Sequence, residues 1–140
     1  MSANPSDDEL RALLRGAKRI AVVGLSPKPD RPSHRIARRL IDWGYEVVPV
    51  RPALAEVLGR KAYARLADVP GTVDLVDVFR APGEIGPIVD DCIARGLPAL
   101  WLQEGVVNAL EAARARAAGI TVVMDRCISV DHRRLLGATA

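Results

Sequence analysis

Aromatic residues, cysteines and long apolar runs are all scarce in this chain of 140 residues. Phe, Trp and Tyr make up only 4% of the sequence although hydrophobic residues reach 49%, so the core must consist mainly of Val, Ile, Leu and Ala. Such a composition suits parallel strands that are covered by helices on both faces. A chain of this length can bury a sizeable core in one domain without disulfides.

The chain has two cysteines, Cys92 and Cys127, and it shows neither a secretory leader nor an apolar run of membrane-spanning length. Disulfide-rich proteins belong to oxidising compartments, and a membrane helix needs about 20 apolar residues. We therefore expect a cytoplasmic protein that does not enter a membrane. The formal net charge is only +3, and the Arg residues are interleaved with acids, so no nucleic-acid surface is predicted.

The residue sets that carry out common catalytic chemistry are also missing. There is no Ser-His-Asp set, paired carboxylate or Cys-x-x-Cys motif, and His34 and His132 lack partners at catalytic or metal-binding spacing. Asp74 and Asp77 lie three residues apart in an apolar run, so on a strand they would face opposite sides and would not converge on a metal. We expect a protein that binds a ligand without catalysing a reaction.

The chain does have a regular alternation of apolar runs and amphipathic segments. The near-continuous runs are typical of parallel strands that are buried on both faces. We predict a single Rossmann-like, doubly wound α/β domain with about five parallel strands in the order 3-2-1-4-5 and helices on both faces. The expected strands are residues 20–24, 46–50, 73–79, 99–102 and 121–124, and the expected helices are residues 7–16, 33–43, 84–95 and 107–118.

The start of the chain is expected to stand apart from this domain. Residues 1–15 would form an N-terminal tail and a leading helix, and residues 16–140 would form the Rossmann-like domain. The first eight residues are polar, so we expect them to be frayed.

The first expected strand ends at Gly24, in a pattern that predicts an anion site. A glycine lets the backbone approach a phosphate closely, and the following helix start points its N–H groups and its positive dipole end at the same place. The donors and cations expected around this turn are the amides of Leu25 and Ser26, the side chains of Lys28 and Arg31, and the helix start at Ser33. Ser33 is itself expected to be the helix N-cap, whether or not a ligand binds.

Arg51 follows the second expected strand, at a position that discriminates between nucleotide cofactors. An NAD site needs a carboxylate there to accept hydrogen bonds from the ribose, whereas a guanidinium cannot accept and favours a phosphate. The turn at Gly24 also lacks the second and third glycines of the dinucleotide fingerprint. NAD is therefore disfavoured, and an NADP-dependent oxidoreductase or an interaction module without a ligand stays an alternative.

Several short segments between residues 20 and 135 together match the sequence pattern of a known protein family. They are Ala21-Val-Val-Gly-Leu-Ser26, Arg31-Pro-Ser33, Val48-Pro-Val50, Gly59-Arg-Lys-Ala-Tyr63, Val73-Asp-Leu-Val-Asp-Val-Phe-Arg80, Trp101-Leu-Gln103 and Val123-Met-Asp-Arg-Cys127. Through them the chain resembles the small stand-alone CoA-binding proteins, whose fold is similar to the CoA-binding domain of the succinyl-CoA synthetase α subunit. One departure is Val50-Arg51-Pro52, where family members usually have Val-Asn-Pro.

The resemblance implies a non-catalytic module that binds coenzyme A or acyl-CoA and acts as a carrier or as a regulatory partner of an acyl-CoA-metabolising enzyme. CoA carries a diphosphate and a ribose 3′-phosphate and so needs two anion sites. The Gly24 turn would take the diphosphate, and Arg31, Arg51 or Lys28 the 3′-phosphate. Gln103 would edge the pantetheine path, and the apolar slot for adenine would be formed by Pro49, Val50, Phe79, Arg80 and Pro82.

Some of these residues also have simpler interpretations. Arg51 and Arg80 would serve equally well as solvated surface cations, and Arg80 is a candidate ion-pair partner for Asp77. Cys127 either lies near the CoA thiol, where Arg126 would favour its thiolate and a mixed disulfide, or packs as a small buried hydrophobe, which we favour.

Overall fold

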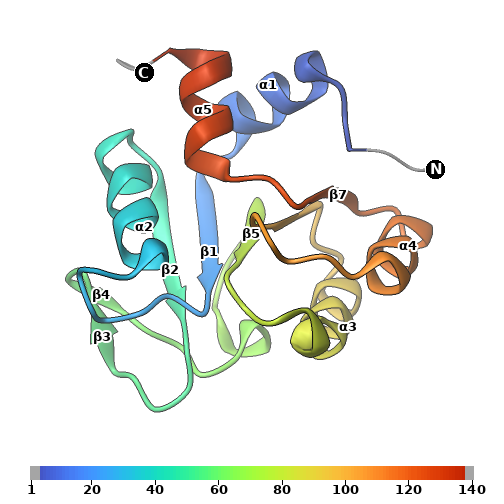
Figure 1. The fold of residues 1–140 in the computed structure, drawn as a ribbon. Helices are drawn as coiled ribbons and strands as arrows, with labels where there is room; N and C mark the ends of the chain where they lie inside the picture. The colour runs from blue at the N-terminus through green and yellow to red at the C-terminus, as the bar shows by residue number, and fades with distance from the viewer. Residues whose placement is uncertain (1–3, 138–140) are drawn as a thin grey trace.

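Five parallel strands form the central sheet of the computed structural model, which describes residues 4–137 (Figure 1). Every strand expected from the sequence is present, and its ends lie within two residues of the expected ones. The strands are β1 (Arg19–Val23), β2 (Glu46–Val50), β5 (Leu75–Val78), β6 (Ala99–Leu102) and β7 (Thr121–Met124). The prediction of an α/β, Rossmann-like fold is confirmed.

The predicted strand order is wrong. The sheet runs β2-β1-β5-β6-β7, so the third of its five strands pairs with the first instead of lying outside the second. Pro49 in β2 gives the physical reason. Its carbonyl faces away from β1 and accepts a hydrogen bond from the N–H of Tyr63, and its missing N–H faces the same way. A strand that lacks a donor on its outer side belongs at the edge of a sheet.

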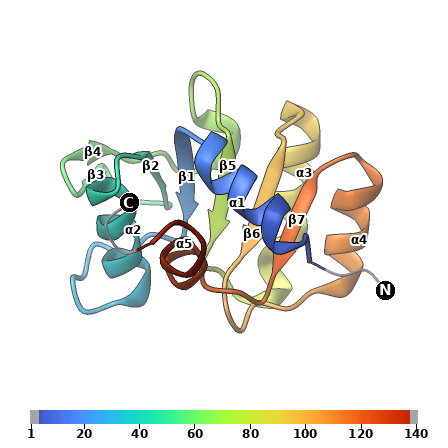
Figure 2. The same ribbon diagram turned by 90° about the horizontal axis from the view of Figure 1, so that it is seen from above.

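Helices cover both faces of the sheet (Figure 2). One face is covered by α1 (Asp7–Gly16), α2 (Pro32–Asp42) and α5 (Ile128–Leu136), and the other by α3 (Ile85–Arg95) and α4 (Ala109–Ala117). The sequence predicted the first four helices in chain order but not α5. Within residues 4–137, no helix is long and apolar enough to cross a membrane.

Short elements fill the connection between β2 and β5. They are a hairpin of β3 (Glu56–Val57) and β4 (Arg60–Lys61), followed by the 3-10 turn η1 (Leu66–Asp68). A second 3-10 turn, η2 (Pro82–Glu84), lies after β5 and precedes α3. Tyr63 follows the hairpin and bridges to Val50 at the outer edge of β2. The hairpin thus folds the chain back over the edge strand.

The first described residues are tied to the domain, so the expectation of a frayed N-terminus is wrong for them. The amide of Asn4 donates to the carbonyl of Met124 (3.0 Å) and accepts from its N–H (2.7 Å), which pairs it with the edge strand β7. Ser6 and Glu9 then form a capping box at the start of α1. Residues 1–3 and 138–140, which the expected tail and domain ranges also include, lie outside the described residues.

Candidate functional site

The ends of β1 and β2 and the start of α2 surround a pocket of about 400 Å³. It lies at the carboxyl edge of the sheet, beside the point between β1 and β5 where the strand order reverses, which is where doubly wound folds bind ligands. We call it the turn pocket. Seven of the predicted binding residues line it, together with Pro27 and Pro32: Gly24, Ser26, Lys28, Arg31, Ser33, Arg51 and Phe79.

Gly24 is required at this turn for two reasons. Its φ of +86° lies in the left-handed region that side chains disfavour, and a Cβ on it would come within 2.5 Å of the carbonyl oxygen of Phe79. Its N–H donates to the carbonyl of Val50 (2.8 Å). The glycine therefore lets the ends of β1, β2 and β5 approach one another and open a crevice between them.

The start of α2 differs from the sequence prediction. Its N-cap is Arg31 and not Ser33, because Pro32 occupies the first helical position, where its missing N–H costs nothing. The Oγ of Ser33 instead accepts from the N–H of Ser26 (2.9 Å), so this amide, a predicted ligand donor, already has a partner within the protein. No side chain in the described part of the chain caps α2.

Two backbone donors are left over at this place. Among residues 4–137, the N–H groups of Leu25 and Ser33 have no hydrogen-bond partner. Unpaired N–H groups at a helix start, together with the positive end of the helix dipole, favour an anion.

The charges around the turn pocket have one sign. Lys28, Arg31 and Arg51 line it, no acidic residue does, and within the described part of the chain none of the three cations has a carboxylate partner. One guanidinium N–H of Arg51 lies 3.5 Å from the carbonyl oxygen of Gly24, which holds the side chain over the turn. The pocket therefore combines free cations with free backbone donors, as a phosphate site requires.

A second, more apolar pocket of about 330 Å³ lies beyond the turn pocket, between β2, η1 and α3. We call it the side pocket. Val50 and Arg80 line it as predicted binding residues, whereas Ala64, Arg65 and Ile88 line it without having been predicted. A shallow hollow joins the two pockets and is lined by Gly24, Arg51, Pro52, Phe79, Arg80 and Ala81.

Arg80 does not pair with Asp77, contrary to our expectation. It forms an ion pair with Glu84 one turn further on, at the rim of the side pocket. Asp77 points to the opposite face of the sheet and is completely buried there, and its carboxylate oxygens have no hydrogen-bond partner among the described residues.

Four predicted residues line neither pocket. The side chain of Leu25 lies in the core, and Pro49 lies within β2. Pro82 begins η2, and its carbonyl accepts from the side chain of Asn108. Gln103 is only 4% exposed, and its Oε1 accepts from the N–H of Ile128 (3.1 Å), so it holds the start of α5.

The fold and the turn pocket together define a Rossmann-like domain with a cationic pocket at the carboxyl edge of its sheet. A model of the CoA binding domain matches residues 18–133, and the chain belongs to that family.

Two similar proteins match nearly the whole chain. YneT of Bacillus subtilis (strain 168) is 41% identical over 129 residues, which cover 92% of this chain and 96% of YneT. A hypothetical protein from Pyrococcus horikoshii OT3 has the same fold with a TM-score of 0.93 and 36% identity, covering 98% of this chain and 99% of its own.

A larger protein contains a similar segment. The α subunit of acetate–CoA ligase (ADP-forming) I from Pyrococcus furiosus is 31% identical over 87 residues, which are 57% of this chain but only 19% of that subunit.

Proposed function

We propose that this protein binds coenzyme A or an acyl-CoA at the carboxyl edge of its sheet and does so without catalysing a reaction. The observation that carries the proposal is the turn pocket, where three unpaired cations meet the unpaired N–H groups of Leu25 and Ser33. Membership of the CoA-binding domain family supports the choice of ligand.

The two pockets suit different parts of CoA. The Gly24 turn and the start of α2 suit the diphosphate, because they present backbone donors at a helix N-terminus. Arg51, with Lys28 and Arg31 beside it, suits the 3′-phosphate. The side pocket is the larger apolar surface at this edge and would accept the adenine, so we extend the predicted slot to Ile88 and Ala64.

The role that we propose for the protein rests on one of its relatives. Among residues 4–137, no group of His, Cys, Asp and Glu could hold a metal ion. We propose a carrier or regulatory module for an acyl-CoA-metabolising enzyme, since a similar segment forms part of a named CoA ligase subunit. Both cysteines are free thiols, which suits a reducing cytoplasm.

Calorimetry with CoA, dephospho-CoA, NADP and NAD tests the proposal. We expect CoA to bind most tightly and removal of its 3′-phosphate to weaken binding. Preference for NADP would instead support an oxidoreductase, and no binding of any nucleotide would support an interaction module.

Arg51→Gln sharpens the test. A charge-assisted hydrogen bond contributes about 1.5–3 kcal/mol, so the substitution should weaken CoA binding roughly ten- to a hundredfold. It should leave dephospho-CoA binding nearly unchanged, because that ligand lacks the phosphate. Arg15→Gln on α1, where an exposed Arg lies outside both pockets, is the matched control and should alter neither affinity.

A further inference from the structure

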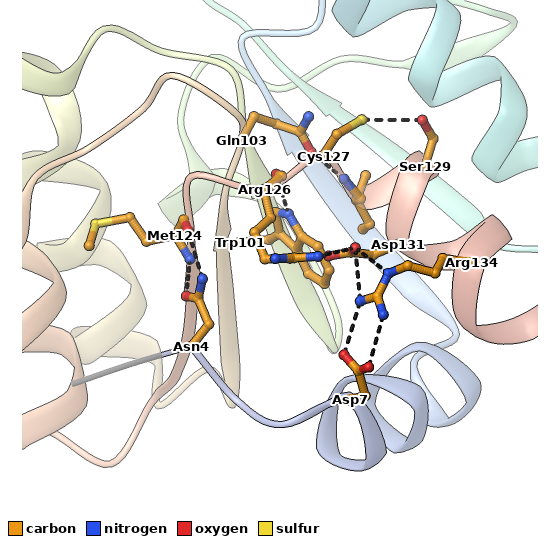
Figure 3. Close-up of polar contacts among 11 residues, drawn as sticks. Asn4, Asp7, Trp101, Gln103, Met124, Arg126, Cys127, Ser129, Asp131 and Arg134 are labelled. Carbon is orange, nitrogen blue, oxygen red and sulfur yellow. Dashed lines mark hydrogen bonds and ion pairs between the residues drawn. The ribbon is translucent and has the colours of Figure 1, made fainter. Parts of the chain in front are cut away.

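Cys127 is held in place by both of its neighbours in the chain (Figure 3). The carbonyl of Arg126 accepts from the indole N–H of Trp101 (2.8 Å), and the N–H of Ile128 donates to the side chain of Gln103 (3.1 Å). Cys127 is the N-cap residue of α5 and has an extended backbone. The backbone on both sides of Cys127 is therefore anchored to β6, which contains Trp101 and ends directly before Gln103.

Arg126 does not serve as the cationic partner of this thiol. Its guanidinium forms two hydrogen bonds of 2.6 Å with Asp131, whose side chain is 1% exposed, and these bonds raise the pKa of Arg126. Asp131 also pairs with Arg134, which reaches Asp7 on α1 (Figure 3).

The surroundings of the Cys127 thiol are polar and only partly closed. The residue packs against the core but stays partly exposed, so the expectation that it is simply buried holds only in part. Its Sγ lies 3.3 Å from the Oγ of Ser129. Cys92, by contrast, is fully buried on α3, and burial above all raises the pKa of its thiol to about 12.

A second observation near Cys127 concerns the side chain of Asp77. It is completely buried beside Cys127, and neither of its carboxyl oxygens has a partner among the described residues. Burial first, and the neighbouring Cys127 second, raise the pKa of this carboxyl well above its ordinary value. An unsatisfied buried polar group is rare outside functional sites.

The thiol belongs to the same edge of the sheet as the turn pocket. Cys127 follows β7, Asp77 lies near the end of β5, and Gly24 follows β1. Cys127 packs in one hydrophobic cluster with Leu25 and Phe79, the two residues that flank the Gly24 crevice. CoA held by its phosphates in the turn pocket carries its thiol on a long pantetheine arm, which can extend over this cluster.

We infer that Cys127 is a thiol–disulfide exchange site for coenzyme A, with Asp77 as the hydrogen-bonding partner of the pantetheine amide next to the CoA thiol. This inference rests on the proposed CoA binding. In the exchange the Cys127 thiol loses its proton to solvent and its sulfur bonds to one sulfur of CoA disulfide. The disulfide bond of the reagent breaks, and the departing CoA thiolate takes up a proton. The disulfide is itself the oxidant.

Intact-protein mass spectrometry with CoA disulfide and, separately, with glutathione disulfide tests this inference. We expect one CoA adduct on Cys127, formed about tenfold or more faster than the glutathione adduct, because bound CoA presents its sulfur at high local concentration. Cys127→Ser should abolish the adduct, and Cys92→Ala, the matched control, should leave it unchanged. Asp77→Asn should keep the preference for CoA, whereas Asp77→Val, which cannot hydrogen-bond the pantetheine amide, should reduce it and leave the slow reaction with glutathione disulfide unchanged.

Other results would overturn the inference. Equal rates with the two disulfides, an adduct on Cys92, or an unaltered preference in Asp77→Val would each contradict it. Calorimetry with CoA under reducing conditions keeps the two proposals apart. Wild-type protein that binds CoA but gains no preferential adduct refutes the exchange site alone, whereas wild-type protein that binds no CoA refutes the proposed function. Cys127→Ser should still bind CoA in this assay.

Discussion

Gly24→Ala tests the structural basis of the turn pocket. An alanine at a φ of +86° carries backbone strain, which costs about 1–3 kcal/mol. Its Cβ would also lie 2.5 Å from the carbonyl oxygen of Phe79, and forcing two backbones apart adds about 1–3 kcal/mol as other overpacking does. We expect the free energy of unfolding to fall by about 2–6 kcal/mol in a urea titration.

Gly105→Ala separates the two causes. Gly105 has the same φ of +86°, but a Cβ on it would meet nothing within 4 Å. This variant should lose only the conformational part, about 1–3 kcal/mol. Equal losses of stability in the two variants would refute the reasoning, because they would show that the close approach of Gly24 to Phe79 costs nothing.

Two further predictions concern buried carboxyls. The folded-state pKa of Asp77 is raised, so its stabilising contribution is present below the unfolded value of 3.8 and is lost as pH rises toward the folded value. Asp77→Asn should therefore gain stability over wild type from about pH 4 upward in urea titrations, and a pH-independent difference would contradict this. Asp131→Asn should cost about 1.5–3 kcal/mol, because the buried carboxylate loses its charge-assisted hydrogen bonds to Arg126, whose side chain is 37% exposed. Asp8→Asn should change stability little, because the Asp side chain of its ion pair is 95% exposed. Similar losses in the last two variants would argue against that difference.

The sequence was sufficient for the strands and for the fold class because strands buried on both faces appear as unbroken apolar runs. Strand order is a property of long-range pairing, which such runs do not record. Pro49 was the one local signal that the second strand lies at an edge, and it argued against the order that we predicted.

Helix α5 escaped prediction because its buried face is unusually polar. Asp131 and His132 are buried on it, and the ring of His132 stacks on Trp43 with centroids 4.0 Å apart. A search for apolar residues at helical spacing cannot find a face built in this way.

The site, like the fold, has parts that local sequence motifs predict and parts that depend on tertiary structure. The residues of the turn pocket could be predicted because the first βα turn and the end of the second strand are local motifs. Arg31 replaces Ser33 as the N-cap of α2 because of a single proline, Pro32. Ala64 and Arg65 line the side pocket because of the way the hairpin folds over β2. Neither leaves a periodic pattern in the sequence.

A crystal structure of the protein with CoA tests the central claim most directly. We predict diphosphate oxygens within hydrogen-bond distance of the Leu25 and Ser33 amides and the guanidinium of Arg51 on the 3′-phosphate. A nucleotide bound elsewhere, with the Gly24 turn empty and Arg51 far from every phosphate oxygen, would contradict the account.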